Sequence, residues 1–237
     1  MSAMNAFFDA ARDILTLIES QEGDKIRQVA ETMSDSIMQG GVPHVFGSGH
    51  SMLPAREVFK RAGTLSCIRA IGLERWVGKF ERLEGFGPIL LKDYDMRPGE
   101  VLIVISSSGI NPLPIEIALE GKKIGMTVVA LTAMEHTTAV ASRHSSKKKL
   151  YEVADIVIDT HVPSGDAAIP IEGISMKVGP LSTIAAVGIM DAIVVATTER
   201  IVQKGGTPPV RISRNLPGGD ENNARFKAMY HDRIPEL

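Results

Sequence analysis

The stretch VLIVISSSGINPLPIEIALEGKKIGMTVVALT, Val101–Thr132, contains the pattern that decides the fold. It opens with an uninterrupted run of aliphatic residues, which is typical of a strand buried on both faces of a parallel sheet. A loop of serine and glycine follows, then a helix predicted over Pro112–Ile124, then a second apolar strand within MTVVALT. Strand, helix and strand in this order predict one unit of a parallel sheet.

The same alternation extends to both sides of this unit. Upstream, VPHVFGSGHSMLPAREVFKRAG (Val42–Gly63) predicts a strand at HVF, a Gly-Ser turn and a helix over Met52–Ala62. Further strands are predicted in LSCIRAI and ADIVIDT, with a short helix over Thr137–His144 and a long one over Pro180–Gln203. The pattern predicts an α/β fold: a three-layer αβα sandwich with a mostly parallel five-stranded sheet, Rossmann-like or flavodoxin-like.

The two ends of the chain and one internal stretch do not follow the alternation. Apolar residues at helical spacing predict two helices within residues 1–40, separated at Gly23. Leu73–Arg97 mixes aromatic, charged and glycine residues, and Gly205–Leu237 is polar and rich in Gly, Pro and Asn. We expect both to be functional or to contact a partner. No linker is evident, so we expect one domain: N-terminal helices, an αβα core over 42–203 and a C-terminal arm.

The composition excludes several classes of protein. The 237 residues are 44% hydrophobic and 23% charged, as in globular proteins, and the net charge of -2 gives no reason to expect a nucleic-acid or anionic-membrane partner. Cys67 is the only cysteine, so no internal disulfide can form. The first residues carry Asp9, Arg12 and Asp13, unlike a signal peptide, and no apolar run reaches the roughly 18 residues of a membrane span. We expect a cytoplasmic protein.

Each of the two strand–loop–helix units has the features of an anion site. The loops leave the carboxyl edge of the sheet, where open α/β folds bind ligands, and each leads into a helix N-terminus that favours a phosphate. Serine hydroxyls add donors, and Asn111 is expected to cap the helix that Pro112 begins. The predicted binding residues are Gly47, Ser48, Gly49, His50 and Ser51 in the first loop and Ser106, Ser107, Ser108, Gly109 and Asn111 in the second.

The loops also limit the kind of ligand. Neither contains the lysine of a nucleoside-triphosphate P-loop, and Met52 stands where a dinucleotide fingerprint needs its third glycine. We therefore expect a small ligand with one phosphate group. The alternative is that both are ordinary solvated turns, because Gly and Ser are common turn residues.

Taken together, VFGSGHS with its helix and the stretch quoted at the outset resemble a sugar isomerase (SIS) domain, over about Val42 to Gln203. Within that family the chain is most similar to uncharacterised phosphosugar-binding proteins grouped near the phosphoheptose isomerases. The resemblance implies that Ser107, Ser108 and neighbouring hydroxyls hold a sugar phosphate. It also implies a homodimer or homotetramer, with the site near the subunit interface.

Interconversion of an aldose and a ketose moves a proton between C1 and C2 through an enediol, which requires a base and an acid. Glu172, in IPIEGISMKVGP, is the candidate base. Arabinose-phosphate isomerases of this family place a catalytic glutamate at a similar distance before a helix start, which Ser182 and Thr183 match here as further substrate-binding candidates. His161, after ADIVIDT, is the candidate acid. The alternatives are a surface or capping glutamate and a histidine bonded to loop backbone.

The chain departs from the family at several positions. NLPGGDENN resembles a C-terminal Ser-His-Pro-Gly-Gly segment of the family, but Leu216 occupies the position of its catalytic histidine. Ile110 occupies a position where many members carry glutamate. His161 is the candidate replacement for the missing histidine. Met52–Ala62 lacks the histidine that phosphoheptose isomerases use for zinc, so we expect no metal and no other cofactor. Glu57, in the same helix, is expected to face either solvent or a site shared between subunits.

Three functions are compatible with these residues. The leading one is isomerisation of an open-chain aldose or ketose phosphate. The second is a sugar-phosphate sensor that has the serine loops but no turnover. The third is a lyase or etherase of amino-sugar phosphates, because a related fold supports elimination beside a carbonyl with a similar glutamate base.

Overall fold

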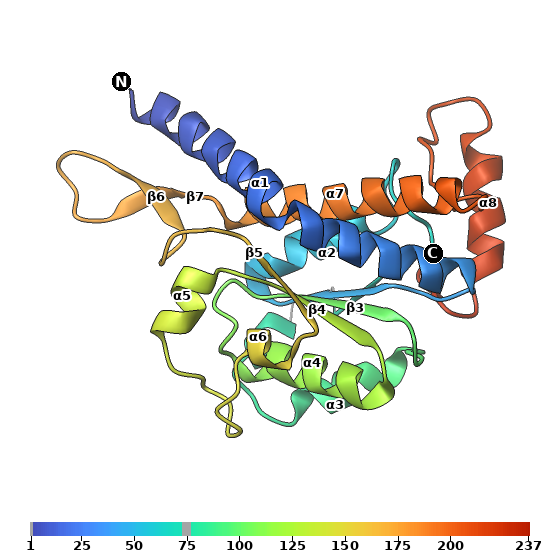
Figure 1. Cartoon of the computed structure of the whole chain (residues 1–237), viewed down its shortest axis with the longest axis horizontal. Coiled ribbons are helices and arrows are strands. Elements are labelled where there is room, and N and C mark those ends of the chain that lie inside the picture. The colour runs from blue at the N-terminus through green and yellow to red at the C-terminus, as the bar shows by residue number, and fades with distance from the viewer. Residues whose placement is uncertain (1, 73–76) are drawn as a thin grey trace.

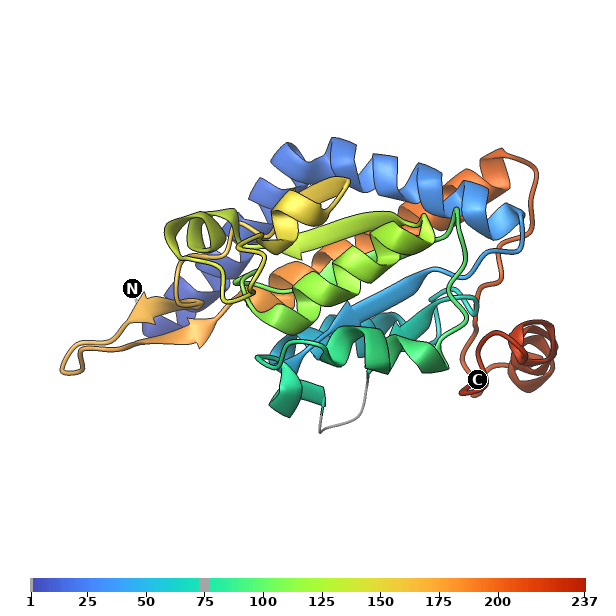
Figure 2. The same cartoon turned by 90° about the horizontal axis from the view of Figure 1, so that it is seen from below.

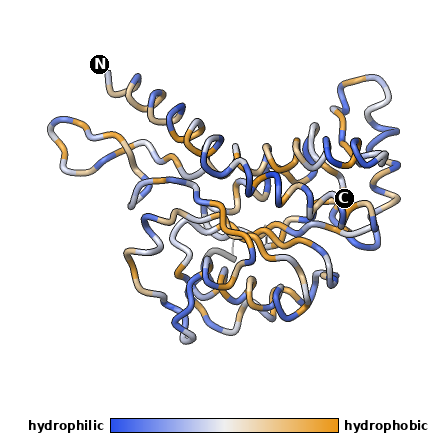
Figure 3. Tube along the Cα trace, in the orientation of Figure 1, coloured by the Kyte–Doolittle hydropathy of each residue, from blue (hydrophilic) through white to orange (hydrophobic). Residues whose placement is uncertain are grey.

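The main sheet is parallel throughout and has five strands among residues 2–72 and 77–237, which the computed structural model describes. Their spatial order is β2 (Arg69–Ile71), β1 (His44–Gly47), β3 (Val101–Ile105), β4 (Thr127–Thr132) and β5 (Ile156–Asp159). The most apolar segments run along these central strands (Figure 3). β3 is buried over its whole length, as predicted for a strand covered on both faces.

Helices cover both faces of the sheet (Figures 1 and 2). On one face, α1 (Ala3–Met38), α2 (Met52–Val58) and α7 (Ser182–Gln203) share a core with the strands. On the other face lie α3 (Phe86–Leu90), α4 (Pro112–Ile124) and α6 (Leu150–Val153). The predicted three-layer αβα sandwich is therefore confirmed. In the described part of the chain, no helix is both long enough and apolar enough to cross a bilayer.

The remaining elements lie at the two edges of the sheet. α5 (Met134–Ala139) follows β4, and an antiparallel hairpin of β6 (Ala167–Pro170) and β7 (Lys177–Pro180) projects from the molecule (Figure 1). α8 (Gly219–Tyr230) lies at the far end of α7. Short 3₁₀ turns are η1 (Gly49–Ser51), η2 (Val77–Phe80) and η3 (Leu91–Asp93). The unassigned stretch Leu73–Arg97 thus contains η2, α3 and η3, while its residues 73–76 lie outside the described residues.

The prediction of two N-terminal helices is wrong, because α1 is a single helix that continues through Gly23. Its buried residues keep one helical register on both sides of the glycine, including Ile14, Ile18, Ile26 and Val29. These buried residues pack against α7 and β5. That packing outweighs the cost of a glycine inside a helix, which is about 1 kcal/mol relative to alanine.

The first prediction concerns this glycine. Gly23→Ala is expected to raise the free energy of unfolding by about 0.5–1 kcal/mol, because alanine loses less backbone entropy in a helix. An added Cβ at this position would lie 3.4 Å from the flexible end of the Arg27 side chain and would meet nothing closer. Urea unfolding of the two proteins measures the difference. A loss of stability would contradict a continuous α1.

Several element boundaries also differ from the predictions, for local reasons. α2 ends at Val58, short of Ala62, because Lys60 has a left-handed backbone with φ of 60°. The short helix is α5, starting at Met134, whose N–H donates to Asp159 Oδ1 at 3.0 Å; the helix predicted over Thr137–His144 is wrong. α4 has the predicted bounds, with Pro112 in its first turn.

The C-terminal arm is part of the core of its own chain. Its apolar residues Phe226, Tyr230, Ile234 and Leu237 are buried with residues of α1 and α7. They recur at helical spacing, which the high content of Gly, Pro and Asn obscured in the sequence. The arm therefore does not depend on a partner chain for its packing.

Buried ion pairs attach the arm to the amino edge of the sheet. Arg69, buried in β2, binds the Glu236 carboxylate with two nitrogens, at 2.7 and 3.2 Å. Arg233 Nη2 lies 2.6 Å from Glu100 Oε1, and Glu100 Oε2 lies 3.4 Å from Nε2 of the buried His44. Burial lowers the pKa of His44, whereas at Glu100 the bonds from His44 and Arg233 outweigh burial and lower the carboxyl pKa.

The second prediction is that acid weakens the fold through this cluster. Below about pH 6.5, the ordinary histidine pKa, the unfolded chain binds a proton at His44 that the folded chain does not. Glu100 adds a loss below about pH 4.3, because its folded pKa is the lower one. Urea unfolding should show stability falling from pH 7.5 to 5.5 and a shallower fall in His44→Gln. His231→Gln, at an exposed site, is the control and should show the same pH dependence of the free energy of unfolding as the wild type. The same pH dependence in His44→Gln would contradict the prediction.

Candidate functional site

The two serine loops meet at one hollow on the carboxyl edge of the sheet. Both loops, the ends of β3, β4 and β5, and the first turn of α7 contribute its lining residues: His50, Ser51, Pro54, Ile105, Ser107, Leu131, Thr160, Ser182, Thr183 and Ala186. The free volume is about 20 Å³, which is room for one water molecule. A phosphate group could therefore enter only when the surrounding side chains move apart.

Glycine is required in the first loop by close backbone approach. A Cβ on Gly47 would lie 2.0 Å from the carbonyl oxygen of Ser51, so any other residue would force the loop open. Gly49 has φ of 56°, and the N–H of Ser51 donates to the Ser48 carbonyl at 3.0 Å. This tight turn places Ser51 in the hollow, while Ser48 is buried behind it.

In the second loop the three serines have different positions. Ser106 is buried, and its hydroxyl accepts the N–H of Gly109 at 3.2 Å, so it holds the loop together. Ser107 lines the hollow, and its carbonyl accepts the N–H of Ala133 at 3.0 Å. Ser108 is partly exposed, and no hydrogen bond among the described residues uses the N–H of Ser107 or Ser108. These two amides are available to an anion.

Asn111 is not the side-chain cap that the sequence suggested. It occupies the position before α4, but its side chain makes no capping hydrogen bond. Its Nδ2 donates to Glu81, and its Oδ1 accepts from Arg143 Nη1 at 2.7 Å. Glu81 Oε2 would lie 3.7 Å from a Cβ on Gly49, so the carboxylate lies beside both serine loops. Asn111 thus links the second loop to its neighbours and does not face the hollow.

Asp166 caps α7, and sequence reasoning missed it. Its Oδ1 accepts the N–H groups of Leu181 and Ser182 at 3.0 and 2.8 Å, and its Oδ2 accepts the Ser182 hydroxyl at 2.7 Å. A carboxylate therefore already occupies the positive end of the α7 dipole. Of the two candidates in this turn, the Ser182 hydroxyl is engaged by Asp166, and Thr183 lines the hollow beside it.

Thr160 is a second residue that sequence reasoning missed. Its hydroxyl is buried, lines the hollow and has no hydrogen-bond partner among the described residues. A buried hydroxyl without a partner is costly, and a ligand oxygen in the hollow would satisfy it. The signal in the sequence was its place directly after the strand IVID, at the same sheet edge as the serine loops.

Comparison with known proteins identifies the family. A family model described as the SIS domain matches residues 6–133. The chain belongs to the SIS-domain family. The match includes α1 and so begins before the Val42 start expected from the motifs.

Relatives of this SIS-domain protein agree along nearly its whole length. A UPF0309 protein of Listeria monocytogenes is 39% identical over 231 residues, covering 98% of each chain. The phosphoheptose isomerase GmhA of Neisseria gonorrhoeae has a TM-score of 0.56 at 18% identity, over 83% of this chain and 97% of that one. The Vibrio vulnificus NanR protein, solved as a complex with ManNAc-6P, has a TM-score of 0.53 at 15% identity, over 100% and 70%. These two structural likenesses establish a shared fold.

His161 of the SIS-domain protein does not line the hollow. Its ring lies between two carboxylates, with Nε2 3.2 Å from Glu22 Oε1 and Nδ1 3.4 Å from Asp159 Oδ2. Glu22 is buried in α1 and also bonds Lys25 at 2.8 Å. The ring of His161 is thus paired with the side chains of Glu22 and Asp159 and not with any loop backbone that the structure describes. This contact connects α1 to the end of β5.

Glu172 and Glu57 also lie outside the hollow in this SIS-domain protein. Glu172 is exposed in the turn between β6 and β7, on the hairpin that projects from the body (Figures 1 and 2). Glu57 of α2 forms an ion pair with Arg61, which follows the helix. Burial and then the charge of Glu57 raise the pKa of Asp191 on the facing helix α7. Of the predicted binding residues, His50, Ser51, Ser107, Ser182 and Thr183 line the hollow, whereas the acid–base candidates Glu172, His161 and Glu57 do not.

Proposed function

We propose that this SIS-domain protein binds a sugar phosphate and interconverts its aldose and ketose forms through an enediol. The observation that carries the proposal is the convergence of Ser51, Ser107, Thr160 and Thr183 on one hollow at the carboxyl edge. Two structural neighbours, the phosphoheptose isomerase and the ManNAc-6P complex of NanR, support this class of ligand.

In the proposed complex the phosphate group enters the hollow and the sugar lies outside it. The hydroxyls and free amides of Ser107 and Ser108, together with the hydroxyls of Ser51 and Thr160, donate to phosphate oxygens. The hollow is too small for a sugar ring, so C1 and C2 must face the solvent side, where a base from another element can approach. His50, which is exposed at the rim, lies on that side.

We assign the base to Glu172 of a second copy in a homodimer or homotetramer. The hairpin carries Glu172 away from the hollow of its own chain (Figure 1). Its exposed apolar side chains, among them Ile174 (50% exposed) and Met176 (68% exposed), are the kind of surface that packs against another subunit. The acid that completes proton transfer is a group of the second copy, because His161 does not line the hollow and its ring is paired with Glu22 and Asp159.

A sensor is the second candidate, because binding and chemistry are separable here. The phosphate candidates lie together, whereas His161 is held by Glu22 and Asp159, and Leu216 replaces the catalytic histidine of related enzymes. Such a protein would bind sugar phosphates without turning them over.

Proton exchange in deuterated water decides between these functions. The protein is incubated with a panel of phosphorylated pentoses, hexoses, heptoses and amino sugars, and deuterium at C2 is followed by NMR. An isomerase incorporates deuterium at C2 and forms the second sugar. A ligand that binds without exchange identifies a sensor, and lactate released from muramic acid phosphate identifies an etherase; either result would contradict the proposed reaction.

A further inference from the structure

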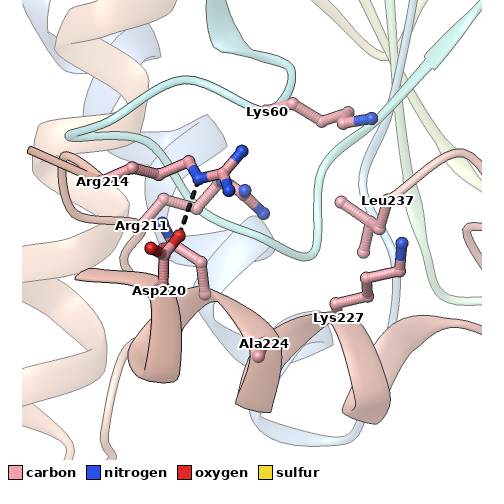
Figure 4. Close-up of a pocket in the computed structure, with 8 residues that line it drawn as sticks. Lys60, Arg211, Arg214, Asp220, Ala224, Lys227 and Leu237 are labelled. Atoms are coloured by element: carbon pink, nitrogen blue, oxygen red, sulfur yellow. Dashed lines mark hydrogen bonds and ion pairs between the residues drawn. The ribbon is translucent and has the colours of Figure 1, made fainter. Parts of the chain in front are cut away.

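A cationic cavity lies under the C-terminal arm, at the opposite end of α7 from the serine hollow (Figure 4). Its volume is about 480 Å³, which is in the range of small-molecule sites. Lys60 after α2 and Arg211, Arg214 and Lys227 of the arm line it, and Leu237 lies at one side. None of these residues takes part in the proposed sugar-phosphate site.

The positive charge in this cavity is not neutralised by its own walls. Among the described residues that line the cavity, Asp220 is the one acidic side chain, and it pairs with Arg214 Nε at 2.7 Å. Lys60 Nζ donates to the backbone carbonyl of Glu236, and this carbonyl group is uncharged. Among the described residues Lys227 forms no ion pair.

Arg211 is the member that the fold holds most firmly. The backbone N–H of Arg211 donates to the Thr64 carbonyl at 2.9 Å, and the backbone carbonyl of Arg211 accepts the N–H of Gly63 at 2.8 Å. The adjacent bridge of Leu65 with Val210 fixes the arm against the loop that follows α2. These bonds fix the backbone from which the Arg211 side chain reaches the cavity.

The guanidinium of Arg211 has unsatisfied hydrogen-bonding capacity. Its Nη1 is buried and has no hydrogen-bond partner within residues 2–72 and 77–237. Burial, followed by the positive charge of Arg214, lowers the pKa of Arg211. The unpaired N–H and the repulsion between the two arginines both destabilise the charged form of Arg211. A bound anion would accept a hydrogen bond from the N–H and offset the repulsion.

We propose that this cavity binds a small phosphate-bearing ligand, at a site separate from the serine hollow. Arg211 and Arg214 present planar donor forks that match phosphate oxygens, and Lys60 and Lys227 add charge without directional demands. Because the ligand would contact the end of α2 and the arm together, it would tighten the attachment of residues 205–237 to the body. The volume of about 480 Å³ matches that of a small metabolite.

Calorimetric titration with inorganic pyrophosphate tests this site. The Ser107→Ala/Ser108→Ala variant is the background, so that the serine hollow does not contribute to the signal. We expect saturable binding of one pyrophosphate per chain in this background, weakened at least about 10-fold when Arg211→Gln is added. Lys123→Gln is the matched control, because Lys123 is an exposed lysine on α4 paired with Glu120; it should bind like the background.

Arg211→Gln could disturb folding, so a second variant, Lys227→Gln, is titrated as well. It changes an exposed side chain of α8. The thermal unfolding of each protein is also measured. Pyrophosphate should raise the unfolding temperature of the background protein and raise it less in Lys227→Gln. The proposal is overturned if pyrophosphate binding fails to saturate at 0.15 M salt, or if both variants bind pyrophosphate like Lys123→Gln. A failure here leaves the C2 exchange result untouched, because the two experiments probe different residues.

Discussion

Replacement of Ser107 and Ser108 together by alanine is expected to weaken sugar-phosphate binding by about 10²- to 10⁴-fold. A hydrogen bond to a charged group contributes about 1.5–3 kcal/mol, and this change removes two hydroxyls beside the amides that face the anion. The folded state should lose little, because Ser107 and Ser108 are partly exposed and the loop is closed by the Ser106 hydroxyl. Calorimetric titration with the sugar phosphate selected in the exchange assay measures the effect.

Ser20→Ala is the control for this prediction. Ser20 is exposed on α1, and its hydroxyl bonds only the carbonyl of Leu17 in its own helix. It should bind sugar phosphate like the wild type. If the double variant also binds like the wild type, the phosphate is held elsewhere and the serine hollow is not the ligand site.

Glu172→Gln is expected to lower turnover by about 10²- to 10⁴-fold, the usual contribution of a general base, while sugar-phosphate affinity stays within about twofold. Glutamine keeps the shape of the side chain but cannot accept the C2 proton. The residue is exposed on the hairpin, so stability should not change. Exchange at C2 and product formation measure turnover, and Glu221→Gln, an exposed glutamate of α8, is the matched control. A normal rate in Glu172→Gln would remove the proposed base.

Mixing the two variants tests whether Glu172 acts on a second copy. In a dimer that assembles at random from equal amounts of Ser107→Ala/Ser108→Ala and Glu172→Gln chains, about a quarter of the sites combine intact serines with an intact glutamate from the other chain. About a quarter of the wild-type activity should return. If the mixture stays inactive although the chains exchange, Glu172 does not act across the interface.

The sequence was sufficient to predict the sheet and the place where the two serine loops meet, because these depend on local patterns. The apolar run of β3, the proline that opens α4 and Gly47 each carry their structural reason within a few residues. Parallel strands bring their carboxyl ends to one edge, so convergence of the two serine loops follows from the topology.

Other features depended on contacts between distant segments and could not be predicted. Glu22 lies 139 residues from His161 in the sequence, and its carboxylate lies beside the imidazole of the histidine that the sequence predicts as the acid. Asp166 caps α7 from the preceding loop, and Thr160 shows its importance only through an unpartnered buried hydroxyl. The continuity of α1 through Gly23 likewise depends on packing against α7, which no local preference encodes.

A crystal structure with a bound sugar phosphate tests the central claim most directly. The account predicts phosphorus density among Ser51, Ser107 and Thr160 at the carboxyl edge, with the hollow widened to admit it and the sugar directed outward. A phosphate bound only elsewhere, with the Thr160 hydroxyl still unpartnered and the hollow closed, would contradict it.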